Sequence, residues 1–249
     1  MARTADPNAR TALSRAARVE FVKKGLVGAR IEDITQACGL SKGAFYLHYP
    51  SKEALFGEVV TGLIAEIERI ANERRAAMDQ FTVEHGGLTP RDFVEHTPKG
   101  ERYLALEVQK DVEILELFWA YRDVVDVLIS GSQGTQFEGA VWLLVDRELQ
   151  RIRADFEQLQ LQRVCRPDMP AELLASLIVG TYLLLAKQMN RHAVKPDLET
   201  WALSLQRLMH EGTTVPEAFR PPRSAAARRS PERRTTRPTG KASRKPLRR

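Results

Sequence analysis

Residues 31–52, IEDITQACGLSKGAFYLHYPSK, constrain the fold more strongly than any other part of the chain. Apolar residues recur at helical spacing at the start of this stretch, which predicts a short helix with one buried face. Gly39 then stands where a left-handed helix cap would lie, a conformation that glycine adopts with little strain. The apolar positions are Ile31, Ile34, Ala37 and Cys38.

A second short helix is predicted directly after this glycine turn. Ser41 is placed to cap its first turn through the side-chain hydroxyl, and Phe45 is expected in the core. Pro50 ends the helix, because the residue before a proline avoids the helical conformation. Ser51 then begins a third helix. Two short helices joined by a tight turn make a helix-turn-helix, a motif that places its second helix in the major groove of DNA.

The second helix carries residue types that suit contact with DNA. Lys42 can bind a phosphate at the helix N-terminus, and Gly43 and Ala44 let the backbone approach a groove closely. Tyr46 and His48 offer hydroxyl and ring N–H groups for phosphates or base edges. A solvated polar helix in an ordinary helical bundle is the alternative interpretation. The candidate DNA-contacting residues are Arg30, Thr35, Ser41, Lys42, Gly43, Ala44, Tyr46, His48, Tyr49 and Lys52.

The stretch from about residue 10 to residue 60 resembles the DNA-binding domain of the tetracycline-repressor (TetR) family. The matching residues are Phe21, Gly25, Ile31, Asp33, Ile34, Ala37, Gly39, Leu40, Ser41, Lys42, Gly43, Phe45, Tyr46, His48, Tyr49, Lys52, Leu55 and Phe56. The resemblance implies a three-helix DNA-binding domain on an all-helical domain that dimerises and binds a small molecule. It also implies a repressor that this molecule releases from double-stranded operator DNA.

The chain departs from the family pattern at two positions. Arg30 replaces the usual Ser or Thr before the first helix of the motif, so the capping hydroxyl is missing and the guanidinium could instead reach a phosphate. Pro50 replaces an apolar residue or a lysine, which affects the exit from the second helix.

Charge is distributed unevenly along the 249 residues. Residues 1–52 carry nine basic and four acidic residues, for a net charge of +5, and residues 220–249 carry twelve basic residues and one acidic residue, for +11. Residues 53–219 carry 17 basic and 27 acidic residues, for −10. The basic N-terminal part fits phosphate binding, whereas the acidic middle does not suit contact with DNA.

Helical patterning in the rest of the chain predicts an all-α protein of about nine helices without strands. The helix that begins at Ser51 should run toward Gln80 and connect the DNA-binding domain rigidly to the remainder. The expected divisions are a disordered N-terminus at residues 1–9, the helix-turn-helix domain at 10–56, a helical effector-binding and dimerisation domain at 57–212, and a basic disordered tail at 213–249.

The last two helical patterns, near residues 171–192 and 196–210, are the candidates for a homodimer interface. A protein that reads a palindromic operator must hold two recognition helices about one DNA turn (~34 Å) apart, which requires two-fold symmetry. A central helix of a monomeric bundle is the alternative for the apolar pattern. The candidate interface residues are Leu173, Leu177, Gly180, Leu184, Trp201, Leu205 and Leu208.

Aromatic residues in the helical part are candidates for lining an effector cavity, because such pockets are mainly apolar with a few polar groups. Aromatic residues at helical spacing are more often ordinary core residues, which is the alternative interpretation. The candidate pocket residues are Phe118, Trp119, Tyr121, Trp142, Tyr182 and Gln188.

The sequence predicts neither an enzyme nor a cofactor, since it has no glycine-rich phosphate loop, His-Glu-x-x-His motif, cysteine pair or nucleophile elbow. His85 and His96 flank a loop with two glutamates, but their spacing is irregular and no metal site is predicted. Two distant cysteines, the lack of an apolar leader, and apolar runs too short for a bilayer predict a cytoplasmic protein without a membrane partner.

Two classes of function remain open at this point. The first is a dimeric repressor that an unidentified small molecule releases from its operator. The second is an effector-independent DNA-binding or nucleoid-associated scaffold, in which the polybasic tail adds sequence-independent affinity for DNA. A solubilising extension is the alternative interpretation of the tail.

Overall fold

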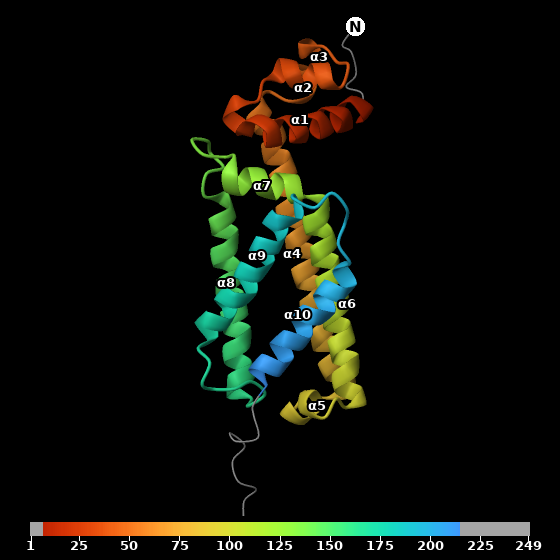
Figure 1. The fold of residues 1–249 in the computed structure, drawn as a ribbon, viewed down its shortest axis with the longest axis vertical. Coiled ribbons are helices and arrows are strands. Elements are labelled where there is room, and N and C mark those ends of the chain that lie inside the picture. The colour runs from red at the N-terminus through yellow and green to blue at the C-terminus, as the bar shows by residue number, and fades with distance from the viewer. Residues whose placement is uncertain (1–6, 215–249) are drawn as a thin grey trace, which may run out of the picture. The chain divides into compact units, whose positions relative to one another are not determined.

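The computed structural model describes residues 7–214, which form ten helices and no strand. This confirms the all-α prediction. The helices are α1 (Pro7–Gly28), α2 (Ile31–Ala37), α3 (Lys42–His48), α4 (Lys52–His85), α5 (Pro90–Val94), α6 (Pro98–Ala120), α7 (Arg122–Ser130), α8 (Ala140–Leu161), α9 (Ala171–Met189) and α10 (Leu198–Thr213). Figure 1 shows α1, α2 and α3 at one end of the long helix α4.

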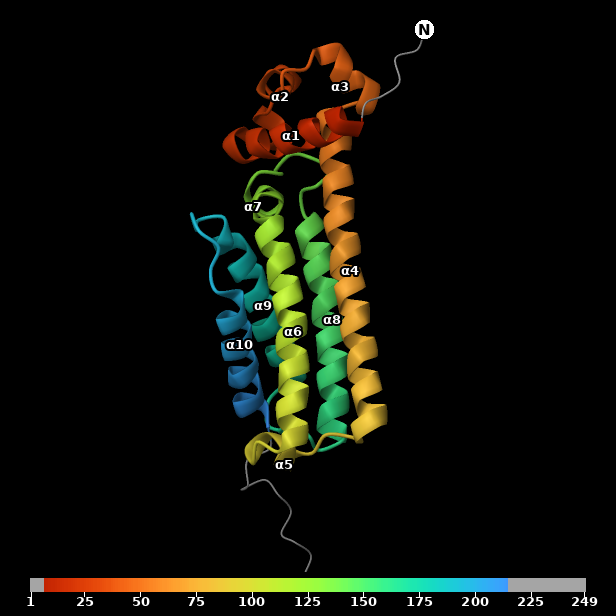
Figure 2. The ribbon, with the colours of Figure 1, turned by 90° about the vertical axis from the view of Figure 1, so that its right-hand side faces the viewer.

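The long helices of the second part run alongside α4. In Figure 2, α6, α8, α9 and α10 run roughly along the direction of α4, with α10 farthest from it, and α7 lies between these helices and α1. The helix α4 therefore belongs to both parts of the fold. It begins where Ser51 accepts a hydrogen bond from the backbone N–H of Ala54 at 3.1 Å, as its capping position predicts.

Several helix boundaries differ from the sequence pattern. Residues 7–9, expected to be disordered, form the first turn of α1. The short helix α5 was not predicted; Thr89 and Asp92 cap it reciprocally and Pro90 occupies its first turn. The predicted tail lies outside the described residues from 215 onward, while residues 213–214 continue from the end of α10.

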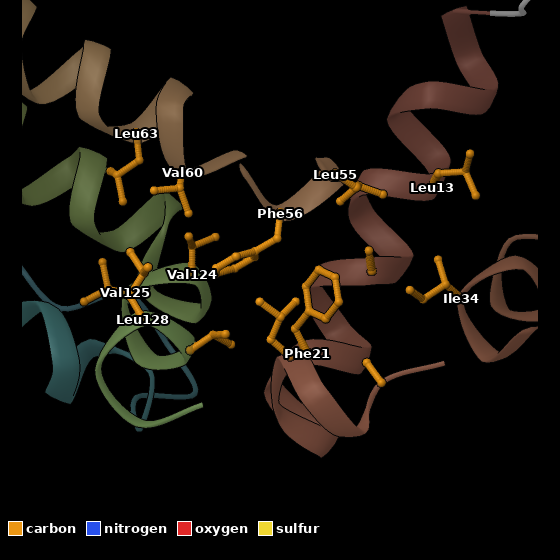
Figure 3. Packing of buried hydrophobic residues seen from close by; sticks show 14 of the residues in the cluster. Leu13, Phe21, Ile34, Leu55, Phe56, Val60, Leu63, Val124, Val125 and Leu128 are labelled. Carbon is orange, nitrogen blue, oxygen red and sulfur yellow. The ribbon is translucent and has the colours of Figure 1, made fainter. Parts of the chain in front are cut away.

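A continuous hydrophobic core joins the N-terminal helices to the rest of the fold. Leu13 and Phe21 of α1, Ile34 of α2 and Phe45 of α3 are fully buried around the start of α4. Figure 3 shows Phe56 of α4 between Phe21 on one side and the α7 residues on the other. The ring of Phe56 packs edge-on against Phe21 at 5.3 Å and against Phe137 at 5.0 Å between centroids.

Directional contacts reinforce this junction between α1 and α7. The guanidinium of Arg18 donates to the carboxylate of Asp123, with an Nε–Oδ2 distance of 2.7 Å. The backbone N–H of Leu26 donates to the carbonyl of Gly131 at 2.9 Å. Gly25 has a φ of +68° and a built Cβ there would lie 3.3 Å from the Gly131 carbonyl oxygen, so glycine meets both the backbone conformation and the close approach.

We predict that Phe56→Ala lowers the free energy of unfolding by about 3–5 kcal/mol, because it leaves a cavity between two aromatic partners. Urea unfolding of the full chain, followed by circular dichroism, measures this change. Val83→Ala is the matched control, since Val83 lies on the same helix and is 85% exposed; it should shift stability by less than about 0.5 kcal/mol. Equal effects of the two substitutions would contradict the role of Phe56.

Candidate nucleic-acid interface and interior cavity

The helices α2 and α3 form the predicted helix-turn-helix, and local interactions define its turn. Gly39 has a φ of +69°, the left-handed conformation expected of a helix cap. The hydroxyl of Ser41 accepts a hydrogen bond from the backbone N–H of Ala44 at 3.1 Å. Phe45 is fully buried and anchors α3 to the core. The opposite face of α3 is therefore turned to solvent.

The exposed face of α3 carries Lys42, Gly43, Tyr46 and Leu47. A Cβ added to Gly43 would meet only the Ser41 hydroxyl oxygen, at 3.8 Å, so the helix leaves open space for a close approach of another molecule. Leu47 was not among the predicted contact residues, although it lies four residues after Gly43 and hence on the same helical face. This spacing was the signal that could have identified it.

Lys42 forms an ion pair with Glu32 of α2. The hydrogen bond between them raises the pKa of the Lys42 ammonium and lowers the pKa of the Glu32 carboxyl. Both side chains are more than half exposed, so the pair is weak in water and open to exchange. A phosphate could replace Glu32 as the partner of Lys42.

Other predicted contact residues lie at the edge of this surface. Arg30 is exposed and makes no side-chain cap hydrogen bond to α2. Ser41 is exposed, but its hydroxyl is engaged in capping α3. Ala44 and His48 are half-buried. Arg30, Ser41 and the exposed residues of α3 are thus accessible on the helix-turn-helix.

Three predicted contact residues are placed elsewhere, which corrects the prediction. Thr35 is only 4% exposed, and its hydroxyl donates to the Glu32 carbonyl at 3.1 Å. Tyr49 is 3% exposed, and its hydroxyl donates to the Glu58 carboxylate at 3.2 Å. The ammonium of Lys52 donates to the carbonyls of Val27 and Ala29, at 2.8 and 2.7 Å. These three side chains make hydrogen bonds within the domain.

The helical part encloses a cavity of about 180 Å³ between α4, α6, α7, α8 and α9. Of the predicted pocket residues, Phe118 and Tyr182 line it. Tyr121 instead lies under the Arg18 guanidinium, and Trp119 lies under that of Arg122. Trp142, at 56% exposed, and Gln188, also exposed, do not line the cavity. These four placements correct the predicted pocket.

A buried polar cluster lies next to the cavity. The carboxylate of Asp111 on α6 is fully buried; it accepts hydrogen bonds from Arg74 of α4 and from Gln206 of α10, both at 2.6 Å. Burial raises the pKa of Tyr182 well above its ordinary value, and the negative charge of Asp111 and a hydrogen bond to it add to the shift. The cluster therefore connects α4, α6, α9 and α10 through satisfied polar groups.

The helix α9 presents an apolar face to solvent. Leu173, Leu177 and Leu184 are each more than half exposed, and no atom lies near a Cβ added to Gly180. On α10, Leu208 is exposed, while Trp201 and Leu205 are half-buried. By length and composition alone, α9 is the one helix within residues 7–214 that could span a membrane, and 28% of its apolar window is buried.

The described residues contain no group of three or more His, Cys, Asp or Glu side chains placed to hold a metal ion. His85 packs against the ring of Phe81, and the Nδ1 atom of His96 lies 3.0 Å from a carboxylate oxygen of Glu101. The two histidines flanking the loop therefore have ordinary structural partners.

Comparison with known proteins identifies the family. Residues 13–59, which span α1 to the start of α4, match the family described as bacterial regulatory proteins, tetR family. This match places the N-terminal domain in the TetR family. The resemblance that the sequence shows in this stretch is thereby confirmed.

Curated relatives match only a short part of the chain. The uncharacterized HTH-type transcriptional regulator YerO of Bacillus subtilis is 60% identical over 35 residues, which cover 14% of this chain and 12% of the relative. The HTH-type transcriptional repressor DhaR of Mycobacterium sp. strain GP1 is 39% identical over 49 residues, which cover 20% of this chain and 25% of the relative. The matched segments thus span a quarter or less of these two relatives.

Solved structures match the TetR fold over most of the chain. The ketosteroid transcriptional regulator KstR2 of Mycobacterium tuberculosis has a TM-score of 0.58 and 17% identity, covering 83% of this chain and 95% of its own. A TetR-like transcriptional regulator from Rhodococcus sp. RHA1 has a TM-score of 0.55 and 19% identity, and the match covers 84% of this chain and 97% of that regulator. At these sequence identities, the structural similarity shows that the chain shares the fold of these proteins over both its DNA-binding domain and its helical part.

We predict that Lys42→Ala changes DNA binding and that Lys52→Ala changes stability. Loss of Lys42 should reduce the slope of log affinity for DNA against log salt by about 0.9, because one phosphate contact is lost. Loss of Lys52 should leave that slope unchanged and lower the free energy of unfolding by about 1 kcal/mol, because two carbonyls lose their donor. Fluorescence anisotropy at several salt concentrations and urea unfolding measure the two quantities. A reduced slope for Lys52→Ala at full stability would contradict its structural placement.

Proposed function

We propose that this TetR-family chain is a cytoplasmic, homodimeric repressor that binds operator DNA through α3 and is released when a small molecule occupies the interior cavity. The observation that carries the proposal is the exposed face of α3 within the family-matched domain. Lys42, Gly43, Tyr46 and Leu47 stand free of the core there, around a helix N-terminus that favours phosphate.

The DNA-binding step follows from the chemistry of this face. Lys42, with Arg30 at its edge, supplies cations for phosphates, and these contacts set the position of α3 in the major groove. The hydroxyl of Tyr46 and the ring of His48 would reach base edges or further phosphates. Because Gly43 has no side chain, the backbone of α3 can approach the groove closely.

Dimerisation is supported by the surface of α9. Leu173, Leu177 and Leu184 recur at the spacing of one helical face, and Gly180 leaves room for close packing. An apolar stripe of this kind in water favours burial against another surface. A second copy of the chain fits, because two recognition helices on a palindromic operator require two-fold symmetry.

Release by an effector is supported by where the cavity lies. Residues of α4 and α7 line it, and the same two helices pack against α1 through Phe56 and Asp123. A molecule that changes the position of α4 or α7 would therefore shift α1 to α3. The competing function, an effector-independent scaffold, has no need of such a cavity and predicts DNA binding that no small molecule releases.

We expect the purified full chain to bind DNA from upstream of its own gene saturably and in the presence of scrambled competitor, with two chains per site. Fluorescence anisotropy at two salt concentrations, followed by a small-molecule release screen, measures this. Specific contacts should preserve the preference for the upstream DNA as salt rises. Binding that weakens equally on every sequence would contradict the repressor and support the scaffold.

We predict that Leu177→Glu converts the dimer to a monomer and weakens operator binding at least about 100-fold, because a buried unpaired carboxylate strongly disfavours the interface. Leu177 is 52% exposed in the single chain, so the folded monomer should persist. Analytical ultracentrifugation and anisotropy measure the two effects. Val194→Glu changes an equally apolar exposed residue outside α9 and should leave both unchanged. A Leu177→Glu protein that remains dimeric would contradict the interface.

A further inference from the structure

The interior cavity has a mainly aliphatic lining that spans five helices. Its wall includes Leu63 and Ile67 of α4, Leu128 of α7, Val141 of α8 and Val179 of α9. Figure 3 shows Leu63 and Leu128 among the buried side chains of α4 and α7. A surface of this composition binds apolar groups and offers little to a charged one.

Four charged residues also line the cavity, and each already has an ionic partner. Arg74 lies 2.6 Å from Asp111, and Lys110 lies 2.9 Å from Glu113. The other two, Arg151 and Glu148, pair with each other at 2.7 Å. An effector that carries a charge would have to separate one of these pairs or enter without a counter-ion.

The one phenol in the lining is engaged as well. Burial and the neighbouring Asp111 carboxylate keep Tyr182 protonated, and its hydrogen bond is made to Asp111. Asp111 also accepts hydrogen bonds from Arg74 and Gln206. The described lining therefore presents polar groups that are already satisfied, and burying a second charge among them is strongly unfavourable.

The volume limits the size of the occupant. A dry cavity of roughly 150 Å³ lined by aliphatic and aromatic side chains accommodates benzene. The cavity here is about 180 Å³, which leaves room for a ring with a short substituent. Larger ligands, such as long acyl chains or fused polycyclic molecules, would extend beyond this space.

We propose that the effector is a small uncharged molecule built on a single ring or a compact branched hydrocarbon, with at most one neutral polar substituent. This assignment rests on the proposed function, which makes the cavity the effector site. The structure supplies both criteria: the volume favours a small effector, and the paired charges of the lining disfavour an anion or a cation.

The test uses three probes of nearly equal shape and different charge: benzyl alcohol, benzoate and benzylammonium. Isothermal titration calorimetry and thermal unfolding of the full chain measure binding directly, without DNA. Benzyl alcohol should bind at least about tenfold more tightly than either ion, because only the ions leave a charge unpaired. Tighter binding of benzoate or benzylammonium, or no binding of benzyl alcohol, would overturn the proposal.

Two variants test whether the bound probe occupies this cavity. Val179→Phe fills the cavity from α9 and should abolish binding of benzyl alcohol, whereas Val83→Phe adds the same ring to an exposed position of α4 and should bind as the original chain does. Glu148→Gln removes one carboxylate from Arg151 and keeps the volume. It should therefore reduce the preference for benzyl alcohol over benzoate about tenfold. If Val179→Phe fails to fold, this variant shows whether the probe occupies the cavity.

Operator DNA separates this inference from the proposed function. Benzyl alcohol that binds the cavity and also weakens operator binding supports both. Cavity binding without any effect on operator DNA supports the assigned class of ligand and contradicts effector-controlled release. Equal binding of benzyl alcohol to the Val179→Phe variant, confirmed as folded by circular dichroism, would overturn the cavity as its site.

Discussion

The edge-on packing of Phe21, Phe56 and Phe137 is the interaction on which the rest of the structure depends, because it joins the DNA-binding helices to the helical part. Hydrophobic burial alone would allow the two parts to slide. The Arg18–Asp123 ion pair and the Leu26–Gly131 hydrogen bond add direction to the contact. With α1 held by both α4 and α7, a displacement of either helix is passed to α2 and α3.

The partners of each lysine decide what it can do in the DNA-binding domain. Lys42 pairs with an exposed carboxylate, and such pairs contribute little to stability, so the ammonium is available to a phosphate. Lys52 donates to two backbone carbonyls and thereby connects the start of α4 to the C-terminal end of α1. Two residues of one type, ten positions apart, therefore differ: Lys52 has a structural role, and Lys42 is the proposed contact with DNA.

The helix α9 links the proposed effector and dimer surfaces. Val179 and Tyr182 face the cavity, whereas Leu177 and Leu184 face solvent on the other side of the same helix. The cluster around Asp111 connects this helix to α4 and to α10. A ligand in the cavity thus contacts the back of the helix that would carry the dimer interface, which provides a short physical route from one protomer to its partner.

The sequence by itself determined the helix-turn-helix, because its signals act over a few residues. Gly39 at positive φ and the capping hydroxyls of Ser41 and Ser51 need only their near neighbours. The apolar stripe at Leu173, Leu177 and Leu184 was also predictable from helical spacing, although the residues that cover it stay a prediction. Amphipathic periodicity and helix capping depend on residues that are close in sequence, so both could be predicted without any tertiary contact.

Only the tertiary structure decided which of the polar and aromatic candidates are accessible. Thr35, Tyr49 and Lys52 share the residue types of DNA contacts, yet the packing of α2, of the segment before α4 and of the first turn of α4 directs them inward. Of the six predicted pocket residues, only Phe118 and Tyr182 reach the cavity, since the choice depends on how α6, α8 and α9 are rotated against each other. An aromatic side chain gains a similar free energy from burial on either face of a helix, so periodicity cannot distinguish a core residue from a cavity wall.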